Sequence, residues 1–314
     1  MTTQLHRDID GLYISRFILE DNIRSALAYA PRRDDLFIAT YPKCGTTWVQ
    51  YIVYNIISEG TPPEDLNEFM LRMPFLEFLG AEGIEKMIRP GAIKTHLPFS
   101  KCPFSKEAKY ICIARNPFDF CVSYYYHTKS APVLQVQDLT FEQYFEMFIN
   151  GRVGYGDYID HLLAWYKHRN DSNVLFFTFE QLKKDKRGHI LKIADFMGEQ
   201  YGKVLREDEV LLNKILDATS LESMKKVFKN DLKTIMSSLA SLPPESRPES
   251  LDVYKSMSVD SRNFKSTGEF LRKGEVGGYM DHFSPEQISR IKDRIASRTE
   301  GSDVITLWKE DGLP

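Results

Sequence analysis

The chain has 314 residues, of which 42% are hydrophobic and 27% are charged, and its formal net charge is −3. This composition is ordinary for a globular protein that builds its core without disulfides or metal. It excludes the strongly basic face of a nucleic-acid-binding protein, and its apolar runs are too short to cross a bilayer, so we expect neither a nucleic-acid nor a membrane partner.

The N-terminal sequence and the cysteines indicate a cytoplasmic protein. The start, MTTQLHRDIDG, carries charges where a secretory signal needs an apolar run. No two of the four cysteines have the C-x-x-C spacing of a zinc or redox motif. We expect reduced thiols and no metal site.

Short apolar runs alternate with segments of helical periodicity. The runs predict buried parallel strands at Leu36–Thr40, Ala92–Thr95, Tyr110–Ala114 and Val174–Phe179. The periodic segments predict helices at Thr46–Ile57, Pro117–Tyr126, Phe141–Ile149, Tyr158–His168, Gly188–Met197, Asp208–Leu216 and, with Ser284 as its N-cap, Pro285–Ser297. The alternation predicts a single α/β domain over residues 1–314, with a central parallel sheet flanked by helices in a P-loop-like nucleotide-binding topology.

The loop after the first predicted strand has the composition of an anion-binding loop. Lys43-Cys44-Gly45-Thr46-Thr47 leads directly into a helix. A helix start presents free N–H groups and a positive dipole end, while the glycine permits close approach and the lysine adds a charge. The lysine precedes the glycine, unlike in the Walker pattern. An ordinary capped strand-to-helix turn is the alternative interpretation.

A histidine follows the second predicted strand, in Lys94-Thr-His96. Imidazole titrates near the working pH, as a general base requires, and Lys94 points to the same side of the strand. A base beside a cation suits transfer of an anionic group to a hydroxyl. A histidine that only stabilises the strand end is the alternative.

Arg115 follows the third predicted strand and opens a second anion-binding loop. Asn116 is expected to cap the next helix, with Pro117 in its first turn. Ser123 lies two turns after Asn116, so Arg115 and Ser123 can share one phosphate. A structural arginine covering the helix start is the alternative. Two such loops at one sheet edge favour a ligand with two separate anionic groups.

Residues 231–263 stand apart because they include SSLASLPPESRPES, which is rich in Ser, Pro and Glu. Such a composition predicts a long loop, which is either a solvated insertion or a lid. Because this loop precedes Phe270-Leu-Arg-Lys-Gly274, we expect it to fold over the side of the site where the acceptor hydroxyl would bind.

The order of these motifs resembles that of the cytosolic sulfotransferase family, from about Leu36 to Gln287. The matching blocks are Tyr41 to Trp48, Lys94 to His96, Arg115-Asn-Pro with Ser123-Tyr-Tyr125, and Phe270 to Gly274. The resemblance implies a metal-independent enzyme that moves a sulfuryl group from 3′-phosphoadenosine 5′-phosphosulfate (PAPS) to a hydroxyl or amine, leaving 3′-phosphoadenosine 5′-phosphate (PAP). It implies a small apolar acceptor, such as a phenol, a catecholamine or a steroid.

The resemblance also implies roles for individual residues. The catalytic set is His96 as general base with Lys43, Lys94 and Ser123. The implied donor-binding residues are Lys43, Cys44, Gly45, Thr46, Thr47, Trp48, Arg115, Ser123, Phe179, Thr219, Met224, Phe270, Leu271, Arg272, Lys273 and Gly274. The implied acceptor contacts are Phe75, Phe78, His96, Tyr126 and His127.

Some positions depart from the family pattern. Cys44 stands where a serine or alanine is usual, Phe179 where a tyrosine is common, and Leu221 where a phenylalanine lies near the adenine. The dimer motif of a lysine, Thr-Val and a glutamate is not met between Met280 and Gln287. We therefore expect a monomer or a weak homodimer.

Other classes of function share part of this pattern. A P-loop-type kinase-like phosphotransferase needs a Walker lysine and an acidic magnesium partner, and neither is clearly placed. A thiol enzyme using Cys44 is a further alternative, because Lys43 and the helix start would lower the pKa of the thiol, but no orienting acid is evident. A non-catalytic nucleotide-binding module has no use for Lys43, Lys94 and His96 together.

Overall fold

The computed structural model describes residues 5–130, 136, 138–228, 242, 247–257 and 271–311. Its central sheet is fully parallel, with the strand order β4-β3-β5-β6. The strands are β3 (Leu36–Thr40), β4 (Ile93–Thr95), β5 (Lys109–Ala114) and β6 (Val174–Thr178). Because the strands are parallel, their carboxyl ends share one rim of the sheet.

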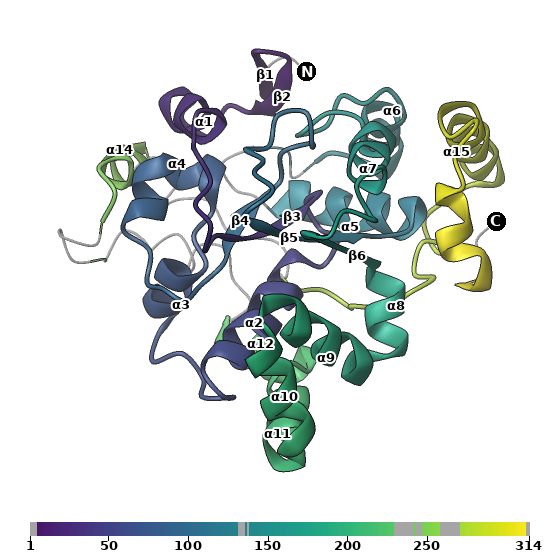
Figure 1. The fold of residues 1–314 in the computed structure, drawn as a ribbon. Helices are drawn as coiled ribbons and strands as arrows, with labels where there is room; N and C mark the ends of the chain where they lie inside the picture. The colour runs from purple at the N-terminus through teal and green to yellow at the C-terminus, as the bar shows by residue number, and fades with distance from the viewer. Residues whose placement is uncertain are drawn as a thin grey trace.

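Helices cover both faces of this sheet (Figure 1). One face packs on α2 (Thr46–Ile57), α9 (Lys186–Met197) and α11 (Glu209–Ala218), and the other on α5 (Pro117–Ser130), α6 (Phe141–Ile149) and α7 (Tyr158–Tyr166). Successive side chains of β3 serve the two faces in turn, since Phe37 and Ala39 join one core cluster and Ile38 joins the other. The continuous apolar runs arise because both faces are covered.

A group of helices lies beyond β4, on the left of Figure 1. It comprises α1 (Glu20–Leu27), α3 (Leu66–Arg72), α4 (Leu76–Glu85) and α14 (Ser250–Met257). The short hairpin of β1 (His6–Ile9) and β2 (Leu12–Ser15) lies nearby. At the opposite edge α15 (Pro285–Arg298) packs on α6 and α7, and the 3-10 helix η4 (Val304–Asp311) follows it. The described residues also form the short helices α8 (Phe179–Lys184), α10 (Glu199–Glu207) and α12 (Leu221–Val227).

The parallel sheet and its flanking helices confirm the predicted fold class. Ser284 caps α15 as expected, accepting the Gln287 N–H, and Asn116 Oδ1 accepts the Asp119 N–H at 2.8 Å at the start of α5. The last predicted strand was one residue too long, because the Thr178 side chain caps α8 and turns Phe179 into helix. Asp208 caps α11 from outside that helix, by accepting the Leu211 N–H.

Two further expectations concern the thiols and the 231–263 segment. The four cysteines are unpaired and buried. Within residues 231–263 the structure describes Leu242 and 247–257, and the rest of that segment lies outside the described residues. No helix in the described ranges is both long enough and apolar enough to cross a bilayer.

Candidate active site

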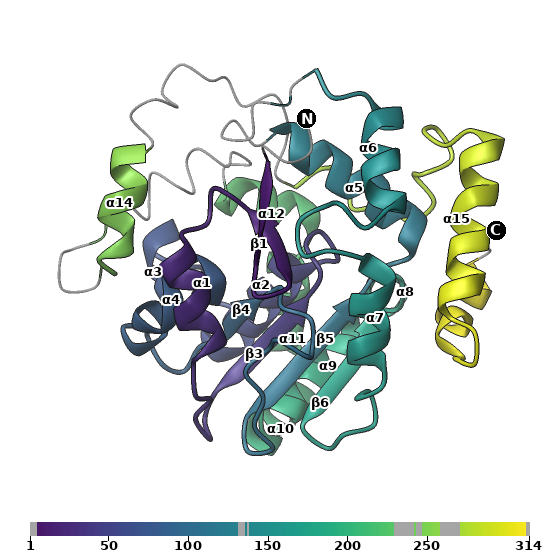
Figure 2. The same ribbon diagram turned by 90° about the horizontal axis from the view of Figure 1, so that it is seen from above.

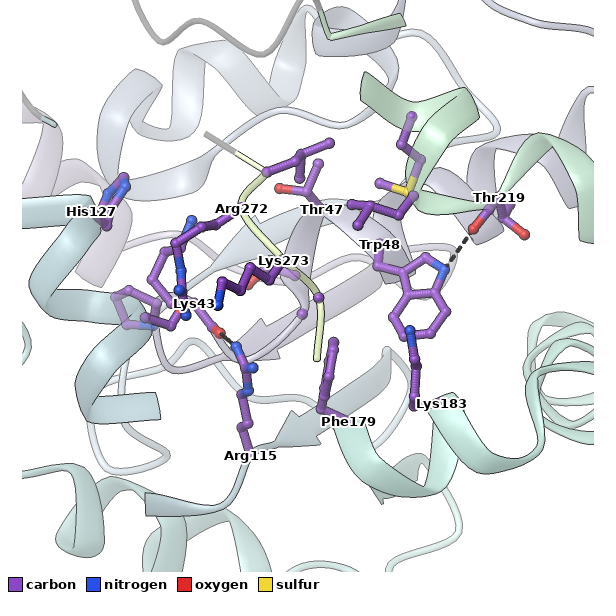
Figure 3. A pocket seen from close by; sticks show the side chains of 18 of the residues that line it. Lys43, Thr47, Trp48, Arg115, His127, Phe179, Lys183, Thr219, Arg272 and Lys273 are labelled. Atoms are coloured by element: carbon purple, nitrogen blue, oxygen red, sulfur yellow. Dashed lines mark hydrogen bonds between the residues drawn. The ribbon is translucent and has the colours of Figure 1, made fainter. Parts of the chain in front are cut away.

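A pocket of about 420 Å³ opens at the carboxyl rim of the sheet. Figure 3 shows Lys43, Arg115, Arg272 and Lys273 gathered on one side of it and Trp48, Lys183 and Thr219 on the other. A cation-rich end and an aromatic end fit a ligand with anionic groups and a flat ring. The full lining is Pro42, Lys43, Gly45, Thr46, Thr47, Trp48, Lys94, His96, Arg115, Ser123, Tyr126, His127, Phe179, Lys183, Lys186, Thr219, Ser220, Leu221, Met224, Leu271, Arg272, Lys273 and Gly274.

The first loop turns sharply between β3 and α2. Lys43 has φ 68° and Gly45 has φ 109°, so both lie in the left-handed region. A Cβ at Gly45 would sit 3.1 Å from both Ile113 Cδ1 and Phe179 Cδ2, and glycine is therefore required for packing as well as for conformation. As N-cap of α2, Gly45 also leaves the first N–H groups of that helix without a capping side chain. The helix start can therefore donate to an anion.

The second loop holds Arg115 from several directions. Its backbone N–H donates to the Tyr158 hydroxyl at 3.1 Å, and its guanidinium lies 4.4 Å from the centre of the Phe179 ring. The guanidinium also donates to the Lys43 carbonyl at 3.4 Å and to the Glu275 carbonyl at 2.9 Å. These contacts bring the two predicted anion loops and the 271–275 segment together.

Asp119 fixes the chain that follows residues 271–274. Its two carboxylate oxygens accept the Gly277 N–H at 2.7 Å and the Tyr279 N–H at 3.0 Å. The Asn116 side-chain amide also donates to Asp119, at 2.8 Å. The start of α5 therefore anchors Arg272 and Lys273 over the pocket.

Tyr126 contacts the segment of residues 271–274, which we call the clamp. Its hydroxyl is 2.8 Å from His282 Nε2, and the Arg272 guanidinium lies 4.8 Å from the centre of its ring. Tyr126 stands three residues after Ser123 and so shares the helix face that carries Ser123, while its acceptor contact stays a prediction. His127 also lines the pocket, and burial, with the charges of Lys43 and Lys94, lowers its pKa well below the ordinary value.

The aromatic end of the pocket is assembled from three segments. The Trp48 indole N–H donates to the Thr219 carbonyl at 2.9 Å, and the Trp48 and Phe179 ring centres lie 5.4 Å apart in an edge-on arrangement. Lys183 and Lys186 also line this end, and sequence reasoning did not single them out. Their signal was weak, since they are two among several surface lysines of α8 and α9.

His96 is buried at the end of β4 and has a defined tautomer. Its Nδ1 lies 2.8 Å from the Thr40 carbonyl oxygen and 3.3 Å from Thr40 Oγ1. Because a carbonyl only accepts, Nδ1 carries the proton and the lone pair is on Nε2. Burial, with Lys94 as the next cause, lowers the pKa of His96 well below its ordinary value, so the ring is neutral.

Two lysines of the pocket, Lys43 and Lys94, are destabilised in their charged form. Burial is the main cause that lowers the pKa of Lys43 to about 7, and Arg115, Lys94 and Arg272 add repulsion. Burial likewise lowers the pKa of Lys94 to about 8. A polyanionic ligand would relieve this repulsion, and the pocket therefore fits one.

Several predicted residues lie elsewhere. The Cys44 side chain is fully buried in the core, its backbone N–H donates to the Tyr41 carbonyl, and burial raises its pKa, so it remains a protonated thiol. Phe75 packs against His96 with ring centres 5.1 Å apart, and Phe78 stacks on Tyr254 of α14 with ring centres 4.1 Å apart. Neither ring lines the large pocket. Phe270 lies outside the described residues.

No three His, Cys, Asp or Glu side chains in the described part of the chain are grouped as metal ligands. The pocket presents arginine and lysine side chains and helix N–H groups to an anion, beside a neutral imidazole. Fold and pocket together define an α/β transferase that works on an anionic nucleotide.

Comparison with known proteins identifies the family. The family model described as "Sulfotransferase domain" matches residues 33–303. Sulfotransferase 1C2 of Oryctolagus cuniculus is 32% identical over 313 residues, covering 96% of this chain and 95% of the relative, and the amine sulfotransferase of the same species is 34% identical, covering 84% and 80%. The mouse sulfotransferase SULT7A1, solved in complex with PAP, is 25% identical with a TM-score of 0.69, and 98% of each chain is covered. The chain belongs to the cytosolic sulfotransferase family, whose enzymes transfer a sulfuryl group from PAPS to small molecules.

This membership confirms the predicted sulfotransferase activity with PAPS as donor. It does not favour the kinase-like phosphotransferase or the non-catalytic nucleotide-binding module.

Proposed function

We propose that this enzyme sulfates a hydroxyl or amine of a small apolar acceptor, with His96 as the general base. The observation that carries the proposal is the 2.8 Å contact between His96 Nδ1 and the Thr40 carbonyl, which leaves the Nε2 lone pair for the acceptor proton. In this reaction His96 Nε2 takes the proton while the acceptor oxygen bonds to sulfur and the bond from sulfur to the bridging oxygen breaks.

Lys43 is proposed to stabilise the leaving phosphate. It stands at the start of α2, where helix N–H groups and the dipole also favour negative charge. The negative charge that grows on the bridging oxygen draws Lys43 into its charged form, which makes a magnesium ion unnecessary. Lys94, with its ammonium 4.1 Å from the centre of the Phe75 ring, steadies the sulfuryl oxygens.

The donor is proposed to lie along the whole pocket. Gly45, Thr46 and Thr47 hold the 5′-phosphosulfate next to Lys43. The 3′-phosphate lies among Arg115, Ser123 and the clamp of Leu271, Arg272, Lys273 and Gly274. Trp48, Phe179, Thr219 and Met224 surround the adenine. The crystal structure of mouse SULT7A1 in complex with PAP supports a nucleotide of this kind.

The acceptor is proposed to lie beyond His96, near Phe75, Phe78 and His127. Phenols, catecholamines and steroids suit an aromatic wall of this kind. The amine sulfotransferase among the relatives keeps amines within the range of acceptors.

We propose that residues 247–257, the described helical part of the 231–263 segment, belong to a lid over the acceptor side. Two contacts of α14 support this: Tyr254 stacks on Phe78, and the Tyr254 hydroxyl accepts the Leu19 N–H at 3.0 Å. In addition, Lys86 Nζ donates to the Arg247 carbonyl at 2.8 Å, which ties the segment to the end of α4. Opening of this segment would admit the acceptor.

We further propose a cytoplasmic monomer or weak homodimer. Four buried, unpaired thiols suit a reducing compartment. The departure from the family dimer motif between Met280 and Gln287 supports a monomer or a weak homodimer. Gel filtration with light scattering at micromolar concentration tests it, and a tight dimer would overturn it.

A sulfation screen tests the proposed function. The purified chain is incubated with labelled PAPS and separate sets of phenols, catecholamines, hydroxysteroids and amines, with and without EDTA. We expect label transfer to at least one set, undiminished by EDTA. Calorimetry should show that the chain binds PAP, and the absence of PAP binding would overturn the proposal.

A further inference from the structure

Glu77 is a fully buried carboxyl group directly behind the reacting side chains. It stands in the first turn of α4, is 0% exposed, and accepts the backbone N–H of His96 on Oε1 at 2.6 Å. Its other oxygen, Oε2, is buried without a hydrogen bond in the described ranges of the chain. Burying such a group is costly, and packing alone does not justify it, because an apolar side chain would fill the same space without that cost.

The segment that carries Glu77 is bonded to the strand end that carries Lys94 and His96. The Lys94 N–H donates to the Pro74 carbonyl at 2.8 Å, and Phe75 forms an isolated parallel bridge with Lys94. The Lys94 ammonium then lies 4.1 Å from the centre of the Phe75 ring. Backbone hydrogen bonds therefore hold the segment of Glu77 against the strand end of Lys94 and His96.

The pKa of Glu77 reflects its burial and its neighbours. Burial raises this pKa to about 7, and it is opposed in part by hydrogen bonds, that from the His96 N–H first, and by the charge of Lys94. Burial raises the pKa values of the nearby Cys102 thiol and Tyr155 phenol well above their ordinary values, so both stay neutral, and His96 is neutral as well.

Glu77 and Lys94 therefore act on each other as opposite charges. Burial lowers the pKa of Lys94 to about 8, and the Glu77 carboxylate opposes that decrease. Lys94 also acts as a like charge on Lys43, whose pKa it helps to lower. Without Glu77, Lys94 would lose its proton at a lower pH.

We propose that Glu77 is a positioning residue of the sulfotransfer reaction, which keeps Lys94 charged in its buried site and seats His96 at the end of β4. This inference rests on the proposed roles of Lys94 and His96. Glu77 itself touches neither donor nor acceptor in this account, and its effect passes through its two neighbours.

The test is the pH profile of kcat at saturating PAPS for wild type, Glu77→Gln and Glu77→Asp. The glutamine keeps a carbonyl oxygen for the His96 N–H and removes the charge. We expect Glu77→Gln to move the alkaline limb of kcat to lower pH by up to about one unit, because the opposite charge that favours protonated Lys94 is lost. The KM for PAPS should change little. Glu77→Asp keeps the charge, and we expect the limb at the wild-type pH.

Two controls separate the charge from the fold. Glu85→Gln, at the exposed end of the same helix, should leave the whole profile unchanged. In Lys94→Arg the guanidinium stays charged, so adding Glu77→Gln to it should produce no further shift of the limb. PAP calorimetry and thermal unfolding of each variant report whether the nucleotide site and the fold are intact.

An alkaline limb of kcat at the wild-type pH in Glu77→Gln would overturn the inference. A decrease in kcat that is equal at every pH would also overturn it, because a purely structural role predicts such a decrease. If Glu77→Gln does not fold, a shifted limb in Glu77→Asp overturns it instead. A wild-type chain that transfers no label from PAPS would instead refute the proposed function. The wild-type measurement therefore distinguishes failure of the proposed function from failure of the role of Glu77.

Discussion

The Thr40 carbonyl oxygen accepts from His96 Nδ1 across the junction of β3 and β4, at 2.8 Å. Both residues stand at strand ends, so the register of the sheet orients the imidazole. Neighbouring groups at the same rim supply cations and helix N–H groups, and the predictions below separate their contributions.

Replacement of His96 by alanine should abolish turnover and spare the nucleotide site. Loss of a general base costs roughly 10²–10⁴ in rate. We expect at least that decrease in kcat, with a PAP dissociation constant near the wild-type value by calorimetry. The matched control is His168→Gln, at a histidine that stacks on Phe99 and lies outside the pocket lining. Full activity of His96→Ala would remove this residue from the mechanism.

Lys43→Met should impair turnover through the leaving group. Removing one stabilising group of this kind costs about 10²–10³ in kcat. Labelled-PAPS turnover measures the effect, and the exposed Lys292→Met serves as the control. Near-normal kcat in Lys43→Met would reject the role of Lys43.

Binding of PAP should take up a proton through Lys43. Its pKa in the free enzyme is about 7, mainly because of burial. The bound anion favours the charged form and raises this pKa, so uptake occurs above about pH 7 and affinity falls as the pH rises further. Calorimetry near pH 8 in buffers of different ionisation enthalpy should report uptake approaching one proton.

The matched variant for this prediction is Lys43→Arg, in which the guanidinium is charged before binding, so the uptake through Lys43 should disappear. A smaller uptake should remain from Lys94, whose pKa is about 8. Equal uptake in both proteins would assign the proton to another group.

Asp119→Asn should weaken donor binding at the clamp. The carboxylate accepts from the Gly277 and Tyr279 N–H groups, and an amide side chain can satisfy only one of them. An unsatisfied buried donor costs about 1–3 kcal/mol, which corresponds to roughly 5–150-fold in the KM for PAPS. Asp281→Asn, an exposed position on the same segment, should have no effect. A decrease in kcat at unchanged KM would contradict the anchoring role.

Trp308→Phe should lower stability without changing the chemistry. The indole N–H donates to Glu180 Oε2 at 2.8 Å in a buried contact, and phenylalanine would leave that oxygen unsatisfied. We expect the free energy of unfolding in denaturant to fall by about 1–3 kcal/mol. The KM for PAPS should be unchanged, and an unaltered denaturation midpoint would contradict the prediction.

The parts of the molecule that depend on local pattern could be predicted from the sequence. Buried strands read as apolar runs because both sheet faces are covered, and the caps at Asn116 and Ser284 are set by residues three positions away. The loops at Lys43 and Arg115 meet at one rim because every strand of the sheet is parallel.

The parts that depend on distant docking could not be predicted. Asp119 meets Gly277 across 158 positions of sequence, and nothing local announces that contact. The contacts of Tyr126 with Arg272 and His282 could not be predicted for the same reason, since both partners are distant in the sequence. Glu77 did leave a signal, a lone carboxylate inside the apolar run Phe75-Leu-Glu-Phe78-Leu, but its partner depends on how α4 packs against β4.

The helices beyond β4, α4 and α14 among them, stand apart from the segments that form the nucleotide pocket (Figure 2). Of these two helices, α4 carries Glu77 and is tied to the strand end of His96, whereas α14 contacts the nearby Phe78 through Tyr254. If the acceptor lies there as proposed, evolution can vary α14, and with it the acceptor, while the use of activated sulfate is inherited unchanged.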